Sequence, residues 1–101
     1  MEILKVSSKS NPNKVAGAIA GVLSKDNQVE LQAIGAGAVN QAVKACAIAS
    51  RFLKERGVEI YVIPGFVEIL INNETRTGIT LKIVAGKREE VETQEVTESE
   101  A

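Results

Sequence analysis

Two segments of this chain combine turn residues, glycines and lysines in a way that suits the binding of anions. The first, Val6–Lys14, reads VSSKSNPNK, and the second, Ile34–Lys44, reads IGAGAVNQAVK. Each follows a short apolar run and leads into an alanine-rich stretch of helical periodicity. Because a helix begins with unpaired backbone N–H groups and partial positive charge, both segments are predicted to attract anions, phosphates above all.

Lysines in the first segment strengthen this prediction. Lys9 and Lys14 stand near a helix start, where positive charge opposes the helix dipole, so they serve either an anionic partner or simply an exposed, solvated loop. The residues of the two segments that are predicted to contact phosphates are Lys9, Asn11, Asn13, Lys14, Gly35, Gly37, Asn40, Gln41 and Lys44.

The glycines of the second segment leave two interpretations open. Gly35-Ala36-Gly37 lacks the third glycine of a dinucleotide-binding fingerprint, because Asn40 stands at that position, and it lacks the Gly-Lys-Ser/Thr ending of a Walker loop. The glycines either serve a tight turn with positive φ or a close approach of helix to sheet, or they cradle a backbone phosphate.

Enzymatic chemistry is not expected. The chain has no histidine, which is the commonest general acid–base and metal ligand. Its single cysteine, Cys46, falls on the apolar side of a predicted helix and is interpreted as a small core residue. The acidic residues outside the C-terminal tail are scattered and show no metal-ligand spacing, so we predict no catalytic site, no metal and no cofactor.

Length and charge predict one small domain followed by a tail. The 101 residues are 45% apolar but include only two Phe, one Tyr and no Trp, so the core should be aliphatic and alanine-filled. Residues 87–101 hold two basic and six acidic side chains, which leaves ten basic and seven acidic ones, a net charge of +3, in residues 1–86. We therefore predict a single domain over 1–86 and an acidic, disordered tail over 87–101. The lone cysteine and the lack of a membrane-length apolar run predict a cytoplasmic protein.

Hydrophobic periodicity and turn residues predict the element order β-α-β-α-β-β, an α+β fold with two helices on one face of a four-stranded mixed sheet. The expected elements are strands at 3–7, 29–34, 58–71 and 78–84 and helices at 12–25 and 38–56. We expect a bulge or kink at Pro64-Gly65 and a hairpin tip at 72–77. The second helix should bury Val39, Val43, Cys46 and Leu53, and Gly17 and Gly21 should allow tight packing of the first helix.

Three segments carry a family resemblance: SSKSNPNKVAGAIAGVL, LQAIGAGAVNQAVKACAIASRFL and VEIYVIPGFVEI. Over residues 1–85 the chain resembles the stage V sporulation protein S (SpoVS) family, which looks like a bacterial branch of the Alba superfamily of small βαβαββ proteins that dimerise and bind DNA or RNA. The resemblance implies an Alba-like fold and a regulatory role in sporulation or development. It implies nucleic-acid contacts at Lys9 and Lys14, in the turn at Gly35-Ala36-Gly37 and at the hairpin carrying Arg76.

These observations favour a regulatory protein that binds DNA or RNA backbones weakly and without sequence specificity. Apolar strands around 63–71 and the alanine-rich helices predict a homodimer or higher homo-oligomer, and no membrane association is expected. Two alternatives stay open: a protein–protein adaptor that does not bind nucleic acid, and a protein that holds a small phosphorylated ligand between the paired helix starts.

Overall fold

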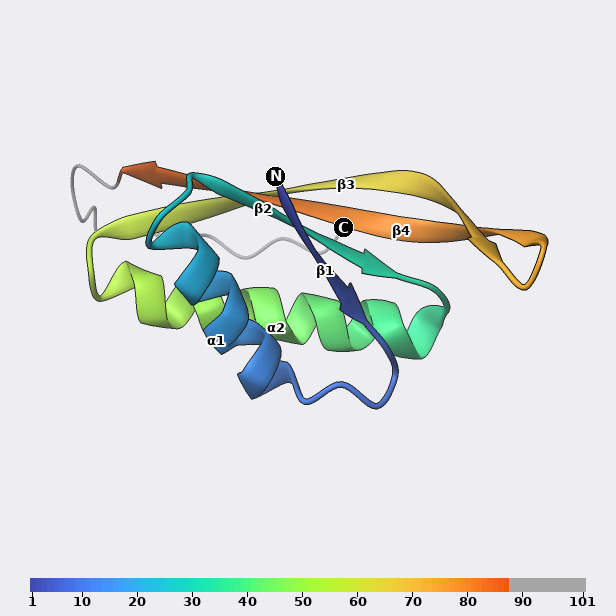
Figure 1. Cartoon of the computed structure of the whole chain (residues 1–101). Coiled ribbons are helices and arrows are strands. Elements are labelled where there is room, and N and C mark those ends of the chain that lie inside the picture. The colour runs from blue at the N-terminus through green and yellow to red at the C-terminus, as the bar shows by residue number, and fades with distance from the viewer. Residues whose placement is uncertain (88–101) are drawn as a thin grey trace, which may run out of the picture.

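The computed structural model describes residues 1–87, which form two helices packed on one face of a four-stranded sheet (Figure 1). The strands are β1 (Glu2–Val6), β2 (Gln28–Ala33), β3 (Val58–Ile71) and β4 (Glu74–Lys87), and the helices are α1 (Pro12–Leu23) and α2 (Ala36–Lys54). This order confirms the predicted βαβαββ fold. Except for Lys87, which ends β4, the predicted acidic tail lies outside the described residues.

The sheet has the strand order β1-β2-β4-β3, in which β1 and β2 are parallel and the other neighbours are antiparallel. Lys5 is the register partner of Gln32, and Val6 is the partner of Ala33. Because parallel strands end at the same edge of a sheet, the chain leaves β1 and β2 side by side before entering α1 and α2. The chain segments that lead into the two helices therefore begin next to each other at one edge of the sheet, as predicted.

The core between sheet and helices is aliphatic, as the composition predicts. Its largest fully buried side chains are Ile19 of α1, Val29 and Leu31 of β2, and Ile83 of β4. The side of α2 that faces the sheet consists mainly of alanines, with Ala42, Ala45 and Ala49 fully buried. Among the described residues, every buried side chain is apolar. Small side chains let α2 lie close to the sheet, so the core is thin and closely packed.

Two expectations about helix packing are wrong. Cys46 and Leu53 are buried, but Val43 is 52% exposed, because the alanine side of α2 faces the sheet and turns Val43 to the flank. Gly17 and Gly21 face open space, with nothing within 4 Å of a Cβ placed at either position. Neither glycine of α1 therefore serves close packing within the described chain.

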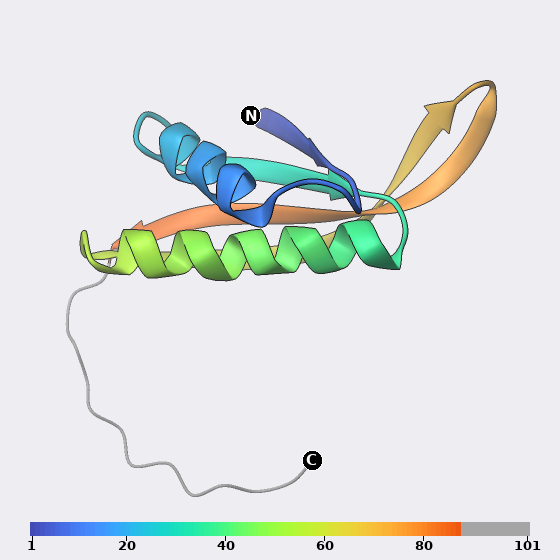
Figure 2. The same cartoon turned by 90° about the horizontal axis from the view of Figure 1, so that it is seen from below.

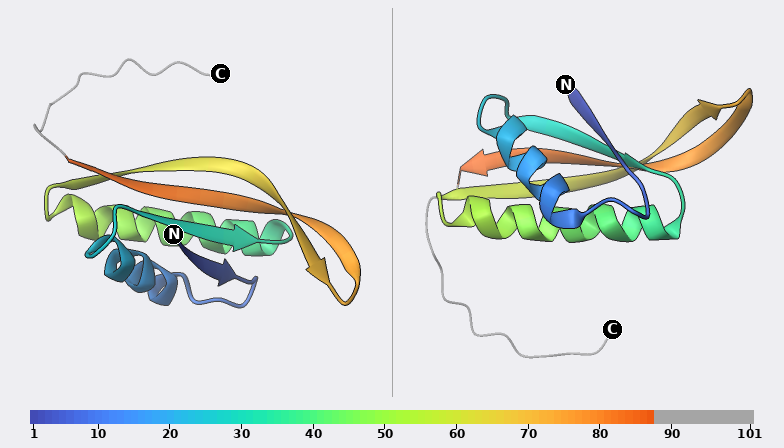
Figure 3. Two further views of the ribbon diagram at one scale, coloured as in Figure 1. Left: turned by 45° about the horizontal axis from the view of Figure 1, so that its top comes forward. Right: turned by 60° about the horizontal axis from the view of Figure 1, so that its bottom comes forward.

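The β3–β4 hairpin extends past the rest of the sheet. β3 pairs with β4 from Val58 to Ile71, whereas β2 pairs only with Ile79–Val84 of β4. The outer part of the hairpin consequently projects beyond both helices, as Figures 2 and 3 show from several sides. The tip is a two-residue turn with positive φ at Asn72 and Asn73, so β4 begins at Glu74 and the expected tip at 72–77 is too long.

No bulge interrupts β3, contrary to expectation. The register runs one-to-one through Pro64, which is opposite Leu81, and Gly65, which is opposite Thr80. β3 is an edge strand, and an edge strand can hold proline because the missing N–H can face away from the neighbouring strand.

Candidate nucleic-acid interface

The loop between β1 and α1 is held in shape by its own short polar side chains. The Ser7 backbone N–H donates to Ser10 Oγ (2.9 Å), and the Lys9 N–H donates to Ser7 Oγ (3.2 Å). Asn11 caps α1, because its Oδ1 accepts from the backbone N–H groups of Asn13 (2.9 Å) and Lys14 (3.4 Å). The side chains of Lys9 and Lys14 are exposed, so this loop presents two free-standing positive charges on an ordered backbone.

The start of α2 is built differently. Its N-cap is Gly35, with φ +90° and ψ 157°, a conformation that is essentially restricted to glycine. No side chain caps this helix, whereas Asn11 occupies the start of α1. Gly35, Ala36 and Gly37 are all exposed, so the first-turn backbone of α2 faces solvent. Of the two helix starts, α2 offers the more accessible N–H groups to an anion.

The two junctions are in direct contact. Gln41 Nε2 of α2 donates to the backbone oxygen of Ser10 over 2.8 Å. A Cβ placed on Gly37 would lie 3.0 Å from Ser8 Cβ, so glycine at this position permits the close approach of the loop. Figure 2 shows the end of β1 and the start of α2 at the same end of the molecule, beside the base of the hairpin.

The structure brings most of the predicted site residues together, but several of them have a structural role. Asn11 and Gln41 already make hydrogen bonds within the chain, and Gly35 and Gly37 are explained by backbone geometry. The side chains left exposed at or near the two junctions are Lys9, Asn13, Lys14, Asn40 and Lys44. Lys44 follows Gln41 by three residues and thus shares its side of α2.

Arg76 lines a hollow at the base of the hairpin, which we call the hairpin pocket and which also reaches the loop after β1. Its lining includes Lys5 and Ser8 from β1 and its loop, Gln32 and Ile34 from the end of β2, and Ile69 and Arg76 from the hairpin. Sequence reasoning missed Lys5 and Gln32. Both alternate with core residues along their strands, which marks the sheet face opposite the helices, but only the register shows them to be neighbours.

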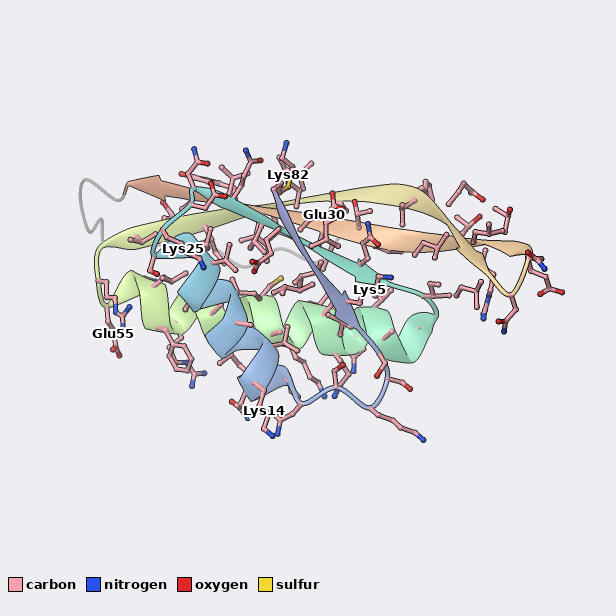
Figure 4. All side chains as sticks on the ribbon, viewed as in Figure 1. Lys5, Lys14, Lys25, Glu30, Glu55 and Lys82 are labelled. Carbon is pink, nitrogen blue, oxygen red and sulfur yellow. The ribbon has the colours of Figure 1, made fainter. Side chains whose placement is uncertain are left out.

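The charges around the junctions are unevenly distributed. Figure 4 shows Lys14 at the start of α1 and Lys5 on β1, so positive groups flank this end in both layers. On the open face of the sheet, Lys82 is the register partner of Glu30, and the two opposite charges offset each other. The centre of the open face therefore carries little net charge. Positive charge lies near the junctions and also at the other ends of the helices, where Lys25 follows α1 and Arg51 and Lys54 lie in the last turn of α2.

The surroundings of Cys46 do not favour nucleophilic chemistry at its thiol. Burial raises the pKa of the Cys46 thiol to about 11, which disfavours the nucleophilic thiolate. Within residues 1–87, no three His, Cys, Asp or Glu side chains lie close enough together to hold a metal ion. In the same part of the chain, no helix combines the length and apolar character needed to cross a membrane.

Comparison with solved structures defines the class of this fold as Alba-like. Alba from Thermoplasma volcanium matches with a TM-score of 0.57 and 14% sequence identity, over 85% of this chain and 100% of that chain. Residues 2–86 match the family model of stage V sporulation protein S (SpoVS). The chain belongs to this family, which confirms the resemblance and supports a sporulation-related regulatory protein.

Proposed function

We propose that this protein regulates sporulation or a related developmental programme by binding the backbone phosphates of DNA or RNA at the two junctions. The observation that carries the proposal is the contact between the junctions, in which Gln41 holds Ser10 and Gly37 lies against Ser8. This contact puts the uncapped start of α2 next to the loop that bears Lys9 and Lys14. Two independent sources of positive potential, side-chain and backbone, then act on the same anion.

Phosphate contacts of this kind set the character of the binding. Each lysine that neutralises a phosphate releases counterions, so affinity falls steeply as salt rises. A domain net charge of +3 over residues 1–86 is modest, which favours weak binding. The contacts at the junctions carry no information on base identity, so binding there is insensitive to sequence. The pKa and metal observations give a reaction no support, which favours a binding protein over an enzyme.

The test is a low-salt mobility-shift series with double-stranded DNA, single-stranded DNA and RNA. The variant Lys9→Glu/Lys14→Glu should lower affinity and reduce the slope of log K against log salt by about one per lysine. Lys25→Glu/Lys54→Glu is the matched control, because it changes net charge equally at exposed sites away from the junctions, after α1 and in the last turn of α2. Equal losses in both double variants, or binding insensitive to salt, would refute the assignment to the junctions.

The exposed apolar flank formed by α2 and β3 supports self-association as a homodimer. A hollow of about 300 Å³ runs between the two elements and is lined by Val43, Cys46, Ala47, Ile60 and Val62, among others. Val43 is 52% exposed and Val62 38%, although both are large apolar side chains. β3 is also an edge strand, which a second copy can cover.

Sedimentation at micromolar concentration tests the dimer. Val43→Asp should shift the protein toward monomer because it puts a charge in the apolar flank. Phe52→Asp is the control on the same helix: Phe52 is 43% exposed and lies nine residues on, on the opposite side of α2. A wild-type protein that sediments only as monomer contradicts the proposal.

The same apolar flank also favours a second candidate, a protein–protein adaptor without direct nucleic-acid binding. In that case a regulatory partner, rather than a second copy, covers Val43 and Val62. A monomer in sedimentation, together with no binding to any of the three nucleic acids at low salt, favours the adaptor over the nucleic-acid-binding dimer.

A further inference from the structure

The hairpin pocket has the size and lining of a site for one nucleotide unit. Its volume is about 400 Å³, within the usual range for small-molecule sites. Its lining residues Lys5 and Gln32 lie on the sheet face opposite the helices. The hairpin, which supplies further lining residues, turns away from β2 there (Figure 3). None of its described lining residues is acidic, while Lys5 and Arg76 are both basic.

One side of the pocket is apolar. Ile34 and Ile69 converge above Gly78 of β4: a Cβ placed on Gly78 would lie 3.1 Å from Ile34 Cγ1 and 3.4 Å from Ile69 Cδ1. Ile71, two residues along β3, lines the same pocket. These side chains come from separate segments and together form an aliphatic surface that a planar group can contact.

Polar groups adjoin this apolar part, and Arg76 is the register partner of Ile69. Lys5 and Arg76 suit phosphate oxygens, and Arg can contact them in a bidentate manner. Gln32 Nε2 donates to Glu30 Oε2 (3.0 Å), which orients the amide and leaves its carbonyl oxygen available as an acceptor. Aliphatic surface, two cations and one oriented amide match the base, phosphate and polar edge of a nucleotide.

We propose that the hairpin pocket binds an unstacked nucleotide of a single-stranded nucleic acid, with the base on Ile34 and Ile69 and a flanking phosphate on Lys5 and Arg76. This inference rests on the proposed function and extends it. Ser8 belongs both to the pocket lining and to the contact with Gly37, so the pocket adjoins the junctions. In a duplex both faces of a base are covered by stacking, so the pocket selects single strands.

The experiment compares a short single-stranded oligonucleotide with a strand of equal length and charge whose sugars lack bases. In fluorescence anisotropy at low salt, wild-type protein should bind the base-bearing strand about fivefold more tightly, at the low end of base-stacking contributions because the surface is aliphatic. Ile69→Ala should remove most of this preference. Ile63→Ala is the control, since Ile63 lies on the same strand and face, is 53% exposed and is outside the pocket.

Arg76→Gln provides a second variant, which should weaken both strands equally and leave the base preference intact. Equal binding of the two strands by wild-type protein, with the salt dependence intact, overturns the pocket proposal while the junctions keep their function. If the wild-type protein binds neither strand, both the pocket proposal and the proposed function of the junctions are overturned. A third outcome is that the protein shows no preference for the base-bearing strand but binds a free nucleoside monophosphate saturably, and that Ile69→Ala weakens this binding. This outcome assigns the pocket to a small ligand and also overturns the proposal.

Discussion

Gly37→Ala tests whether contact between the junctions determines the position of the lysine-bearing loop. The new Cβ would lie 3.0 Å from Ser8 Cβ, which is closer than non-bonded carbons prefer, so Ser8 must move by a few tenths of an ångström. Ser8 lies between Ser7 and Lys9, and the Lys9 N–H donates to Ser7 Oγ. A shift of Ser8 therefore displaces Lys9 as well.

The magnitude follows from two opposing terms. Replacing a helical glycine by alanine stabilises by about 0.5–1 kcal/mol, and Gly17→Ala measures this gain alone because nothing lies within 4 Å of its Cβ. At Gly37 the overpacking penalty, about 1–3 kcal/mol in well-packed sites and at the lower end beside an exposed loop, offsets that gain. We expect the free energy of unfolding of the Gly37→Ala variant to be at least about 1 kcal/mol lower than that of the Gly17→Ala variant.

Urea unfolding followed by circular dichroism supplies the free energies, and low-salt anisotropy supplies the binding. Adding Ser8→Gly removes the clashing carbon, so the double variant should show positive coupling in stability and regain affinity. If Gly37→Ala stabilises as much as Gly17→Ala and binds nucleic acid normally, the junctions are not coupled through this contact and the reasoning fails.

Three further outcomes are expected. Gly35→Ala should destabilise by about 1–3 kcal/mol in urea unfolding, because φ +90° with ψ 157° is strained for any residue with a Cβ; a neutral result would mean that the turn relaxes. Asn11→Ala should cost about 1 kcal/mol through loss of the α1 cap, whereas Asn13→Ala, which removes no cap, should cost less in the same assay. Burial raises the pKa of Cys46 to about 11 from 9.0, so above pH 9 the unfolded state loses its thiol proton first. The free energy of unfolding of the wild-type protein should therefore fall between pH 9 and 11, and that of the Cys46→Ala variant should fall less over this range. Identical pH profiles of the two proteins would contradict the raised pKa of Cys46.

Local signals in the sequence predict the helices well. Asn11 and Pro12 mark the start of α1, and Gly57, with φ +75°, follows α2 closely, although the helix already ends at Lys54 with Glu55 as its C-cap. These signals operate within a few residues, so they need no knowledge of the fold. Contact between the junctions was also predictable, because parallel pairing of β1 and β2 is enough to bring two helix starts together.

Errors arise where the answer depends on distant parts of the chain. Val43 has the apolar character of a core residue, but the alanines decide which side of α2 approaches the sheet. Pro64 suggests a bulge only if its strand has neighbours on both sides, and the sequence does not reveal that β3 is an edge strand. Lys5 and Arg76 are far apart in the chain and share a pocket only because β4, rather than β3, pairs with β2.

The alternation of β3 separates the two surfaces proposed for this protein. Ile60 and Val62, at even positions, line the hollow beside α2, whereas Ile69 and Ile71, at odd positions further along, line the hairpin pocket. Successive side chains of a strand point to opposite faces, so these two pairs of residues lie on different faces of β3, although Leu70, at an even position, also lines the hairpin pocket. Substitutions at Val62 should therefore alter oligomeric state without altering base preference, and substitutions at Ile69 should do the reverse. A single variant that changed both would mean that the hairpin moves on self-association and couples the two surfaces.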